Sequence, residues 1–213
     1  MKKISDCYLY GIIDLGYTAP ADVALTAEKM IEGGVDIIQL RAKNYSEKDV
    51  LWLARDIAPV TREADVPFII NDFPEISAEV GAQGAHVGQD DLTPEQTRLL
   101  AGKKAIIGKS THSYTQAVVA RAEGADYVGL GPLFATPTKP GRKPIGLNEI
   151  ARAHQFVPIP IFCIGGIKLE NLAEVIAAGA KRVVIVSAML KAPDIASYAR
   201  DARAMLSEMT KSK

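Results

Sequence analysis

The sequence predicts a single α/β domain, a (β/α)8 barrel (TIM barrel) over residues 1–213, and three observations favour that fold. Eight short apolar runs occur along the chain, and a stretch with helical periodicity follows each of them. The length fits one such barrel, since these domains span about 200 to 400 residues. No linker rich in proline and serine divides the chain. The expected strands begin near Tyr8, Asp36, Pro67, Ala85, Ala105, Asp126, Pro160 and Arg182.

A weak glycine-led repeat agrees with this alternation of strands and helices. Four segments are each expected to end a helix with glycine and then enter a strand, and they recur about every 40 to 55 residues. They are residues 33–38, 84–87, 124–128 and 179–184, at the second, fourth, sixth and eighth strands. A doubly wound open sheet is the alternative fold, but it needs a switch point and fewer strands.

The expected strands are apolar throughout, as in residues 68–70 and 183–186, which is typical of parallel strands buried on both faces. The helical stretches are amphipathic, as in residues 20–32 and 169–178, and should pack outside the strands. In a barrel, the loops that follow the strands converge on one mouth. Residues far apart in the sequence can therefore share one site there.

Composition excludes several classes of partner. The 25 basic and 25 acidic side chains balance, so no overall field draws the chain to nucleic acid or to an anionic membrane. No apolar run approaches the ~20 residues of a membrane-spanning helix, and no signal-peptide segment precedes Asp14. We therefore expect a cytoplasmic protein. The two cysteines, Cys7 and Cys163, are expected to be core residues without a disulfide.

The second strand ends with a run of hydrogen-bond donors. In an extended chain, Gln39, Arg41 and Lys43 point to the same side. Such a group suits phosphate oxygens, because Arg binds two oxygens at once and Lys acts as a mobile point charge. A solvated, charged loop is the alternative.

Two aspartates follow the third and fourth strands, Asp72 and Asp91. Two carboxylates beside a cationic cluster favour Mg²⁺, which takes oxygen ligands and often keeps water and substrate phosphate among them. The alternative is that each aspartate caps a helix. Asp72 would then cap the helix after Pro74, and Asp91, or Thr93 itself, the helix that begins near Thr93.

The end of the fifth strand offers a hydroxyl and an imidazole. Ser110 could contact a substrate ring, and His112 has an ordinary pKa near ~6.5 that suits proton transfer. Ser113, with Gln116 three residues on, predicts a helix N-cap. His86, in the fourth strand, is expected to be a hydrogen-bonded residue of the barrel interior.

The longest connection follows the sixth strand, over residues 129–146. We expect a lid whose Thr136, Thr138 and Lys139 meet an anionic substrate and exclude water on closure. A flexible surface loop is the alternative.

The seventh and eighth strands end with a glycine pair and a serine. Barrel enzymes frequently bind phosphate at this place, through backbone N–H groups that Gly165, Gly166 and the helix start at Ser187 could supply. A tight turn is the alternative for the glycine pair. With the donors of the second strand, the sequence predicts two anion sites, as two phosphorylated substrates would need.

These residues resemble the thiamine phosphate synthase family from the first strand to the eighth. The matching segments are Gln39-Leu40-Arg41-x-Lys43, Asn71-Asp72, His86-x-Gly88-Gln89-x-Asp91-Leu92, Gly108-x-Ser110-x-His112, Gly131-Pro132-x-Phe134-x-Thr136-x-Thr138-Lys139, Ile164-Gly165-Gly166 and Val186-Ser187. The resemblance implies a magnesium-dependent transferase. Its substrates would be 4-amino-5-hydroxymethyl-2-methylpyrimidine pyrophosphate and hydroxyethylthiazole phosphate, and its products thiamine phosphate and pyrophosphate, formed by a dissociative mechanism.

The resemblance also implies a role for each matching residue. It assigns the pyrophosphate to Gln39, Arg41, Lys43, Asn71 and Lys139. It assigns magnesium to Asp72 and Asp91, the pyrimidine to Ser110, the thiazole to Thr136 and Thr138, and the thiazole phosphate to Gly166, Val186 and Ser187. Within this set, the residues expected to be catalytic are Arg41, Lys43, Ser110 and Lys139.

One position departs from the family, because Asp14 follows isoleucine where a Thr-Asp ending is usual. The related thiazole tautomerases resemble the chain at residues 110–113 and 164–166. An isomerase in which His112 moves a proton therefore stays open, as does a non-catalytic barrel that binds thiazole or thiamine phosphate. The retained cations and aspartates favour the synthase. The sequence leaves a homo-oligomer open.

Overall fold

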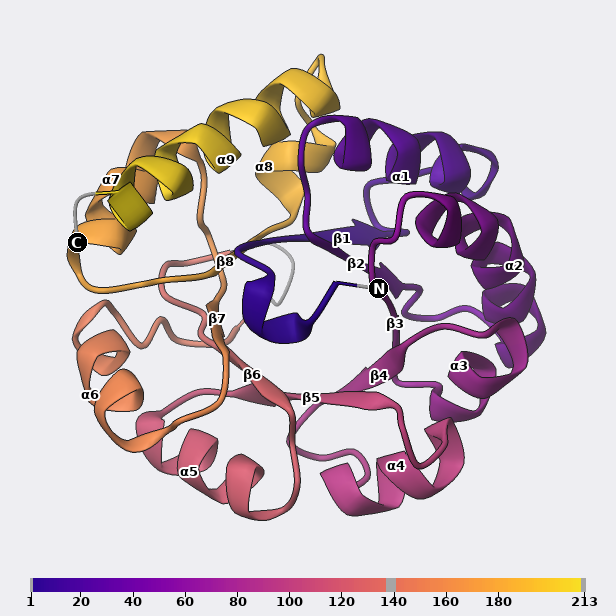
Figure 1. The fold of residues 1–213 in the computed structure, drawn as a ribbon, viewed down its shortest axis with the longest axis horizontal. Helices are drawn as coiled ribbons and strands as arrows, with labels where there is room; N and C mark the ends of the chain where they lie inside the picture. Colours follow the sequence, from indigo (N-terminus) through magenta and orange to yellow (C-terminus); the bar gives the residue numbers. More distant parts are fainter. Residues whose placement is uncertain (1, 137–140, 212–213) are drawn as a thin grey trace.

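The computed structural model describes residues 2–136 and 141–211, in which eight parallel strands close into a barrel (Figure 1). The strands follow one another around the barrel in chain order, and β8 closes it against β1 with Leu9 opposite Val183. The predicted barrel is thus confirmed, and the open sheet is excluded. The strands are β1 (Leu9–Asp14), β2 (Ile37–Arg41), β3 (Phe68–Asn71), β4 (Gly84–Val87), β5 (Ile106–Thr111), β6 (Tyr127–Leu130), β7 (Ile161–Cys163) and β8 (Val183–Ile185).

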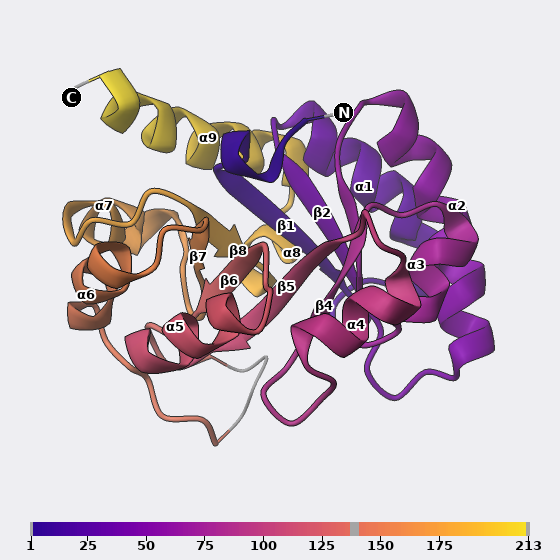
Figure 2. The same cartoon turned by 60° about the horizontal axis from the view of Figure 1, so that its bottom comes forward.

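The helices form an outer ring around the strands (Figures 1 and 2). Two short 3-10 helices, η1 (Ile4–Asp6) and η2 (Pro20–Asp22), precede β1 and α1. The α-helices are α1 (Val23–Glu32), α2 (Glu47–Glu63), α3 (Pro74–Val80), α4 (Pro94–Ala101), α5 (Tyr114–Ala122), α6 (Asn148–Phe156), α7 (Leu169–Ala177), α8 (Ser187–Leu190) and α9 (Ile195–Lys211).

Local sequence signals explain where several helices begin. Thr93 and Gln96 form a reciprocal capping box at α4, and Ser113 accepts the backbone N–H of Gln116 at the start of α5, as predicted. The predicted glycine repeat is right at three of its four positions, where a glycine with positive φ ends the helix. It is wrong at Gly84, which lies inside β4, where an added Cβ would come 1.8 Å from the Ile106 carbonyl oxygen. The glycine that ends α3 is Gly81.

Alternate residues of the strands build two separate apolar layers. The barrel interior holds Tyr10, Tyr127 and Phe162, whose rings pack with centroids 5.3 to 5.9 Å apart. A larger cluster fills the space between the strands and the helices, with Leu9 and Ile13 of β1 among its members. The same strand therefore supplies both layers, which accounts for its continuous apolar sequence.

A buried aspartate ties the start of the chain and the last helix to the amino-terminal end of the barrel. Asp36 precedes β2, is 3% exposed, and accepts the backbone N–H groups of Tyr8 and Leu9 at 2.8 and 3.0 Å. It also forms ion pairs with Lys2 and with Arg203 of α9. This carboxylate thus joins β1, β2 and the last helix.

The two cysteines are buried and unpaired, as expected. Burial raises the pKa of each thiol to about 12. Neither can supply a thiolate nucleophile near neutral pH. In the part of the chain that the structure describes, no helix is both long and apolar enough to cross a membrane.

Candidate active site

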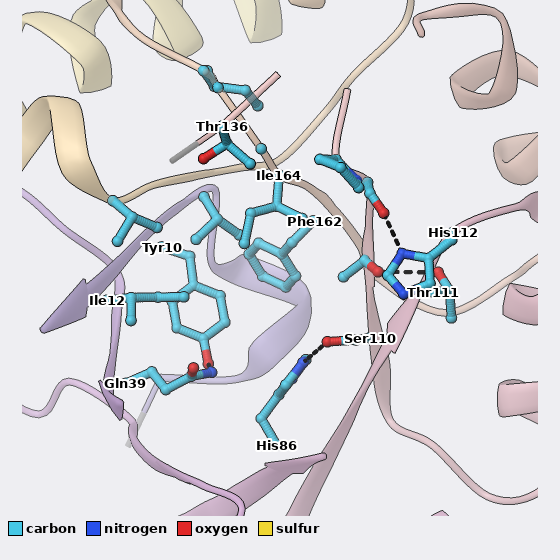
Figure 3. Close-up of a pocket in the computed structure, with 18 of the residues that line it drawn as sticks. Tyr10, Ile12, Gln39, His86, Ser110, Thr111, His112, Thr136, Phe162 and Ile164 are labelled. Carbon is cyan, nitrogen blue, oxygen red and sulfur yellow. Dashed lines mark hydrogen bonds between the residues drawn. The ribbon is translucent and has the colours of Figure 1, made fainter. Parts of the chain in front are cut away.

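A cavity opens at the carboxyl-terminal mouth of the barrel and encloses about 760 Å³ of empty space, part of it open to solvent (Figure 3). Its lining of aromatic and aliphatic side chains with a few polar groups suits a small organic ligand. Residues from β1, β2, β4, β5, β6, β7 and β8, or from the loops after them, line it. Six of the predicted site residues are among them: Gln39, Ser110, Thr136, Gly166, Val186 and Ser187.

A chain of hydrogen bonds crosses the floor of this cavity. Gln39 Nε2 donates to Tyr10 Oη at 2.7 Å, and Tyr10 Oη lies 2.9 Å from Tyr127 Oη. His86 continues the chain, with Nδ1 3.1 Å from Tyr127 Oη and Nε2 3.0 Å from Ser110 Oγ. Burial raises the pKa of both tyrosines, so their hydroxyls stay protonated. The prediction that His86 is a hydrogen-bonded interior residue is confirmed.

Tyr10 and Tyr127 are site residues that the sequence reading missed. Both lie within strands that read as continuous apolar runs, and each has its hydroxyl inside the barrel. Their signal was available, because residues of β1 alternate between the interior and the helix layer and Tyr10 shares the inner side with Ile12. A polar-tipped aromatic on that side needs a buried partner.

Arg41 ends β2 and forms an ion pair with Asp14 at the end of β1, with Arg41 Nη1 2.6 Å from Asp14 Oδ2. Asp14 is almost fully buried and also accepts the backbone N–H of Gly16 at 2.9 Å. Asp14 therefore holds the guanidinium group of Arg41 in place. Its role is to orient Arg41. Gln39, Arg41 and Lys43 each meet a different partner.

Lys43 forms an ion pair with Asp72, which directly follows β3. Asp72 has a φ of 67°, a left-handed conformation that is uncommon for aspartate and is often found at functional sites. Asp72 and Asp91 line the same shallow hollow, together with Asp90. Half-buried Asn71 ends β3 beside them.

Neither aspartate is a helix N-cap. The N-cap of α3 is Phe73, which makes no side-chain capping bond, and the N-cap of α4 is Thr93. Asp91 instead accepts the backbone N–H of Gly88 at 2.6 Å and so folds its own loop. Capping therefore does not account for either carboxylate.

The loop that carries Asp91 is fastened to β5 at two points. Lys109 Nζ donates to the carbonyl oxygen of Leu92 at 3.0 Å, and Gln89 Nε2 donates to the carbonyl oxygen of Ser110 at 2.6 Å. Lys109 is 4% exposed, and burial lowers its pKa. These bonds hold the loop between β4 and α4 beside the end of β3.

His112 lies on the wall of the cavity after β5 (Figure 3). Its Nδ1 is hydrogen-bonded to the carbonyl oxygen of Gly131, and its backbone N–H donates to Gln116 Oε1 at 2.7 Å. Because a carbonyl can only accept, Nδ1 carries a proton. Nε2 of a neutral His112 is then a proton acceptor.

The connection between β6 and α6 begins against the glycine pair after β7. A Cβ added to Gly165 would come 2.4 Å from Pro132 Cα, and one added to Gly166 would come 2.7 Å from Phe134 Cβ. Both glycines also have positive φ, 99° and 68°. They therefore let the connection pack closely over the cavity. The predicted site residues Thr138 and Lys139 lie outside the described residues.

The comparisons with known proteins identify the relatives of this chain. The family model described as thiamine monophosphate synthase matches residues 9–189. Thiamine-phosphate synthase from Chloroflexus aurantiacus is 40% identical over 97% of this chain and 96% of its own length. That of Thermus thermophilus is 44% identical over 84% of this chain and 86% of its own length.

A solved structure resembles the whole fold. Thiamine phosphate pyrophosphorylase from Pyrococcus furiosus has a TM-score of 0.86 and 30% sequence identity, covering 95% of this chain and 96% of that chain. A 3-hexulose-6-phosphate synthase, with a TM-score of 0.67 and 23% identity, covers 93% of this chain and 99% of its own and shares the barrel alone. With a family match over residues 9–189 and relatives about 40% identical, the chain belongs to the thiamine monophosphate synthase family of enzymes.

Proposed function

We propose that this enzyme joins 4-amino-5-hydroxymethyl-2-methylpyrimidine pyrophosphate to hydroxyethylthiazole phosphate and releases thiamine phosphate and pyrophosphate. The observation that carries the proposal is the layout of the barrel mouth. A partly apolar cavity that suits two rings lies at the same end of the barrel as Arg41, Lys43, Asp72 and Asp91. The names of the relatives support the same reaction.

In this proposal, the cavity holds the two rings in one part and the thiazole phosphate in another. Ser110, on the floor, would face the pyrimidine, and Thr136 the thiazole. Thr138, which lies outside the described residues, is proposed beside Thr136. Backbone N–H groups of Gly166, Val186 and Ser187 would bind the thiazole phosphate, a role that the shared lining of the cavity supports.

The pyrophosphate would lie beside the hollow at the ends of β3 and β4. Arg41, Lys43, Asn71 and Lys139 are proposed to bind its oxygens, with Gln39 reaching it from the floor. Arg41 is preorganised by its ion pair with Asp14. Because this pair already fixes the guanidinium group, little side-chain entropy is lost when the substrate binds.

Asp72 and Asp91 fit a magnesium ion. They line one hollow, and among residues 2–136 and 141–211 no group of three or more His, Cys, Asp or Glu side chains could hold a metal. Mg²⁺ in proteins is typically bound by one or two carboxylates, with water and substrate phosphate as its other ligands. A metal held by protein side chains alone would need more of them. When bound there, Mg²⁺ would supply charge neutralisation to the leaving pyrophosphate.

The chain's own residues would then act by binding and alignment. Arg41, Lys43 and Lys139 stabilise the negative charge that develops on the leaving group as the carbon–oxygen bond breaks. The cavity walls exclude water while the aminopyrimidine stabilises the methylene cation. The thiazole nitrogen captures this cation, so that no nucleophilic side chain is needed. Thr136 and the phosphate cradle align the second ring.

Incubation of the purified protein with both substrates and Mg²⁺ tests the proposal, with thiamine phosphate as the expected product. Arg41→Ala and Lys139→Ala should each lower kcat by about 10²-fold, roughly 3 kcal/mol of transition-state stabilisation. Arg55→Ala, which removes an exposed ion pair with Glu79, is the matched control and should keep full turnover. Absence of product with several divalent metals and over a range of pH would refute the function.

An isomerase is a second candidate, and the position of His112 favours it. Its Nε2 is a proton acceptor on the wall of the cavity, as a proton shuttle on a thiazole carboxylate phosphate would need. Isomerisation that is lost in His112→Ala, together with no synthase activity in the parent, would select this reaction. A non-catalytic barrel is the remaining alternative, and tight binding of thiazole or thiamine phosphate without any turnover would select it. The cytoplasmic location and a homo-oligomer stay predictions.

A further inference from the structure

The hydrogen-bond chain on the cavity floor has a direction. A tyrosine hydroxyl has one proton to donate. Gln39 Nε2 donates to Tyr10 Oη, and within the described residues the other partner of that oxygen is Tyr127 Oη. Tyr10 is fully buried, so its proton must go to Tyr127, or it would be left without an acceptor. The proton of Tyr127 must in turn go to His86 Nδ1.

This direction fixes the imidazole and then the serine. If His86 Nδ1 accepts from Tyr127, a neutral His86 carries its proton on Nε2. Nε2 then donates to Ser110 Oγ, 3.0 Å away. None of the hydrogen bonds in this series uses the hydroxyl proton of Ser110. Since Ser110 lines the cavity, its hydroxyl can donate to a ligand (Figure 3).

The strand beside the chain makes room for it. A Cβ added to Gly108 of β5 would lie 2.4 Å from both His86 Nδ1 and Tyr127 Oη. Any side chain at this position would push apart His86 Nδ1 and Tyr127 Oη, whose hydrogen bond links the two tyrosines to His86. The contact between Tyr127 and His86 therefore depends on a glycine in the middle of a strand, where glycine is otherwise unfavourable.

We propose that Tyr10, Tyr127 and His86 are positioning residues that keep Ser110 a hydrogen-bond donor toward the ring subsite. The subsite then selects a ligand whose facing atom has a free lone pair, such as an unprotonated ring nitrogen. A neutral pyrimidine has that atom, whereas a ring protonated there would turn an N–H toward the serine proton. The ligand class rests on the proposed function, but the direction of the chain does not.

The direction can be measured on the ligand-free, full-length protein by ¹⁵N NMR of its three histidines, His86, His112 and His154. His86→Gln identifies the His86 signals by their loss. We expect the shifts of a neutral ring with the proton on Nε2, and a mixture of tautomers in Tyr127→Phe. A proton on Nδ1 in the parent would overturn the proposal, whatever reaction the enzyme performs.

A pair of substitutions at His86 tests the effect on binding. His86→Gln keeps an N–H donor as many bonds from the backbone as Nε2, while His86→Met has similar length and no donor. We expect KM for the pyrimidine pyrophosphate to rise about 10-fold in His86→Met and about 3-fold or less in His86→Gln, with KM for the thiazole phosphate unchanged.

Tyr8→Phe is the matched control for Tyr127→Phe, because Tyr8 lies at the other end of the barrel, where its ring contacts Arg182 and Arg203. It should leave both KM values and the His86 tautomer unchanged. KM for the pyrimidine pyrophosphate could instead rise equally in His86→Gln and His86→Met, or KM could rise equally for both substrates. Either result would show a merely structural role and overturn the proposal. A parent without synthase activity would reject the proposed function and leave the NMR result to decide the direction.

Discussion

Replacement of Gly108 by alanine should destabilise the protein because of overpacking in the barrel interior. The added Cβ would lie 2.2 Å from Tyr127 Cζ, and both neighbouring rings are held in the packed floor. Insertion of one carbon into a well-packed core costs about 1 to 3 kcal/mol. For a domain of this length, that corresponds to a fall in Tm of about 2 to 12 °C. Thermal melts followed by circular dichroism, with urea denaturation for the free energy of unfolding, measure it.

Gly129→Ala is the control for this prediction. Gly129 flanks the same histidine from β6, but a Cβ there would meet its nearest atom, His86 Cε1, at an ordinary 3.6 Å. We expect a change in the free energy of unfolding below about 1 kcal/mol in this variant. If Gly108→Ala proved as stable as Gly129→Ala, the close packing described for the floor would be wrong.

Three further predictions follow from other parts of the structure. Asp14→Asn should lower the free energy of unfolding by about 2 kcal/mol in urea denaturation, since it leaves Arg41 without its carboxylate partner. Glu79→Gln, which removes the carboxylate of an exposed ion pair, is the control. A loss in Asp14→Asn no larger than in the control would contradict the prediction. Lys109→Met should raise the Mg²⁺ concentration for half-maximal activity by about 10-fold, because it releases the loop that carries Asp91, a proposed magnesium ligand. An unchanged value would show that Lys109 does not support the proposed site. Burial raises the pKa of the Cys163 thiol from its ordinary value of 9.0 to about 12 in the folded chain. Its contribution to the free energy of unfolding should therefore be complete below pH 9 and be lost as the pH rises toward 12. In Cys163→Ala, the free energy of unfolding should fall less steeply over this pH range.

The barrel could be predicted from the sequence because each of its signals is local. A continuous apolar run, an amphipathic stretch and a capping pair such as Ser113 and Gln116 can each be recognised within a few residues. The misplaced element was small and had a physical reason. The glycine pattern predicts a helix end at Gly84, but its lack of a side chain serves a close approach to Ile106 within the sheet.

The site was predicted less completely because its partners come from distant strands. The triplet at the end of β2 gave no sign that Asp14 would hold Arg41, or that Asp72 would pair with Lys43. Tyr10 and Tyr127 are 117 positions apart, and their contact depends on the closure of the barrel. Residues whose task is to orient a neighbour have no motif of their own, so only the folded arrangement shows them.

The fastening at Asp36 has a consequence for how this enzyme is handled. Lys2 and Arg203 both reach this one carboxylate, and the start of the described chain and α9 lie on the opposite side of the molecule from the described parts of the connection between β6 and α6 (Figure 2). An affinity tag or a surface tether fused before Lys2 or after α9 would thus extend from the side of the molecule that faces away from the proposed active site. Such additions should alter heat resistance well before they alter catalysis.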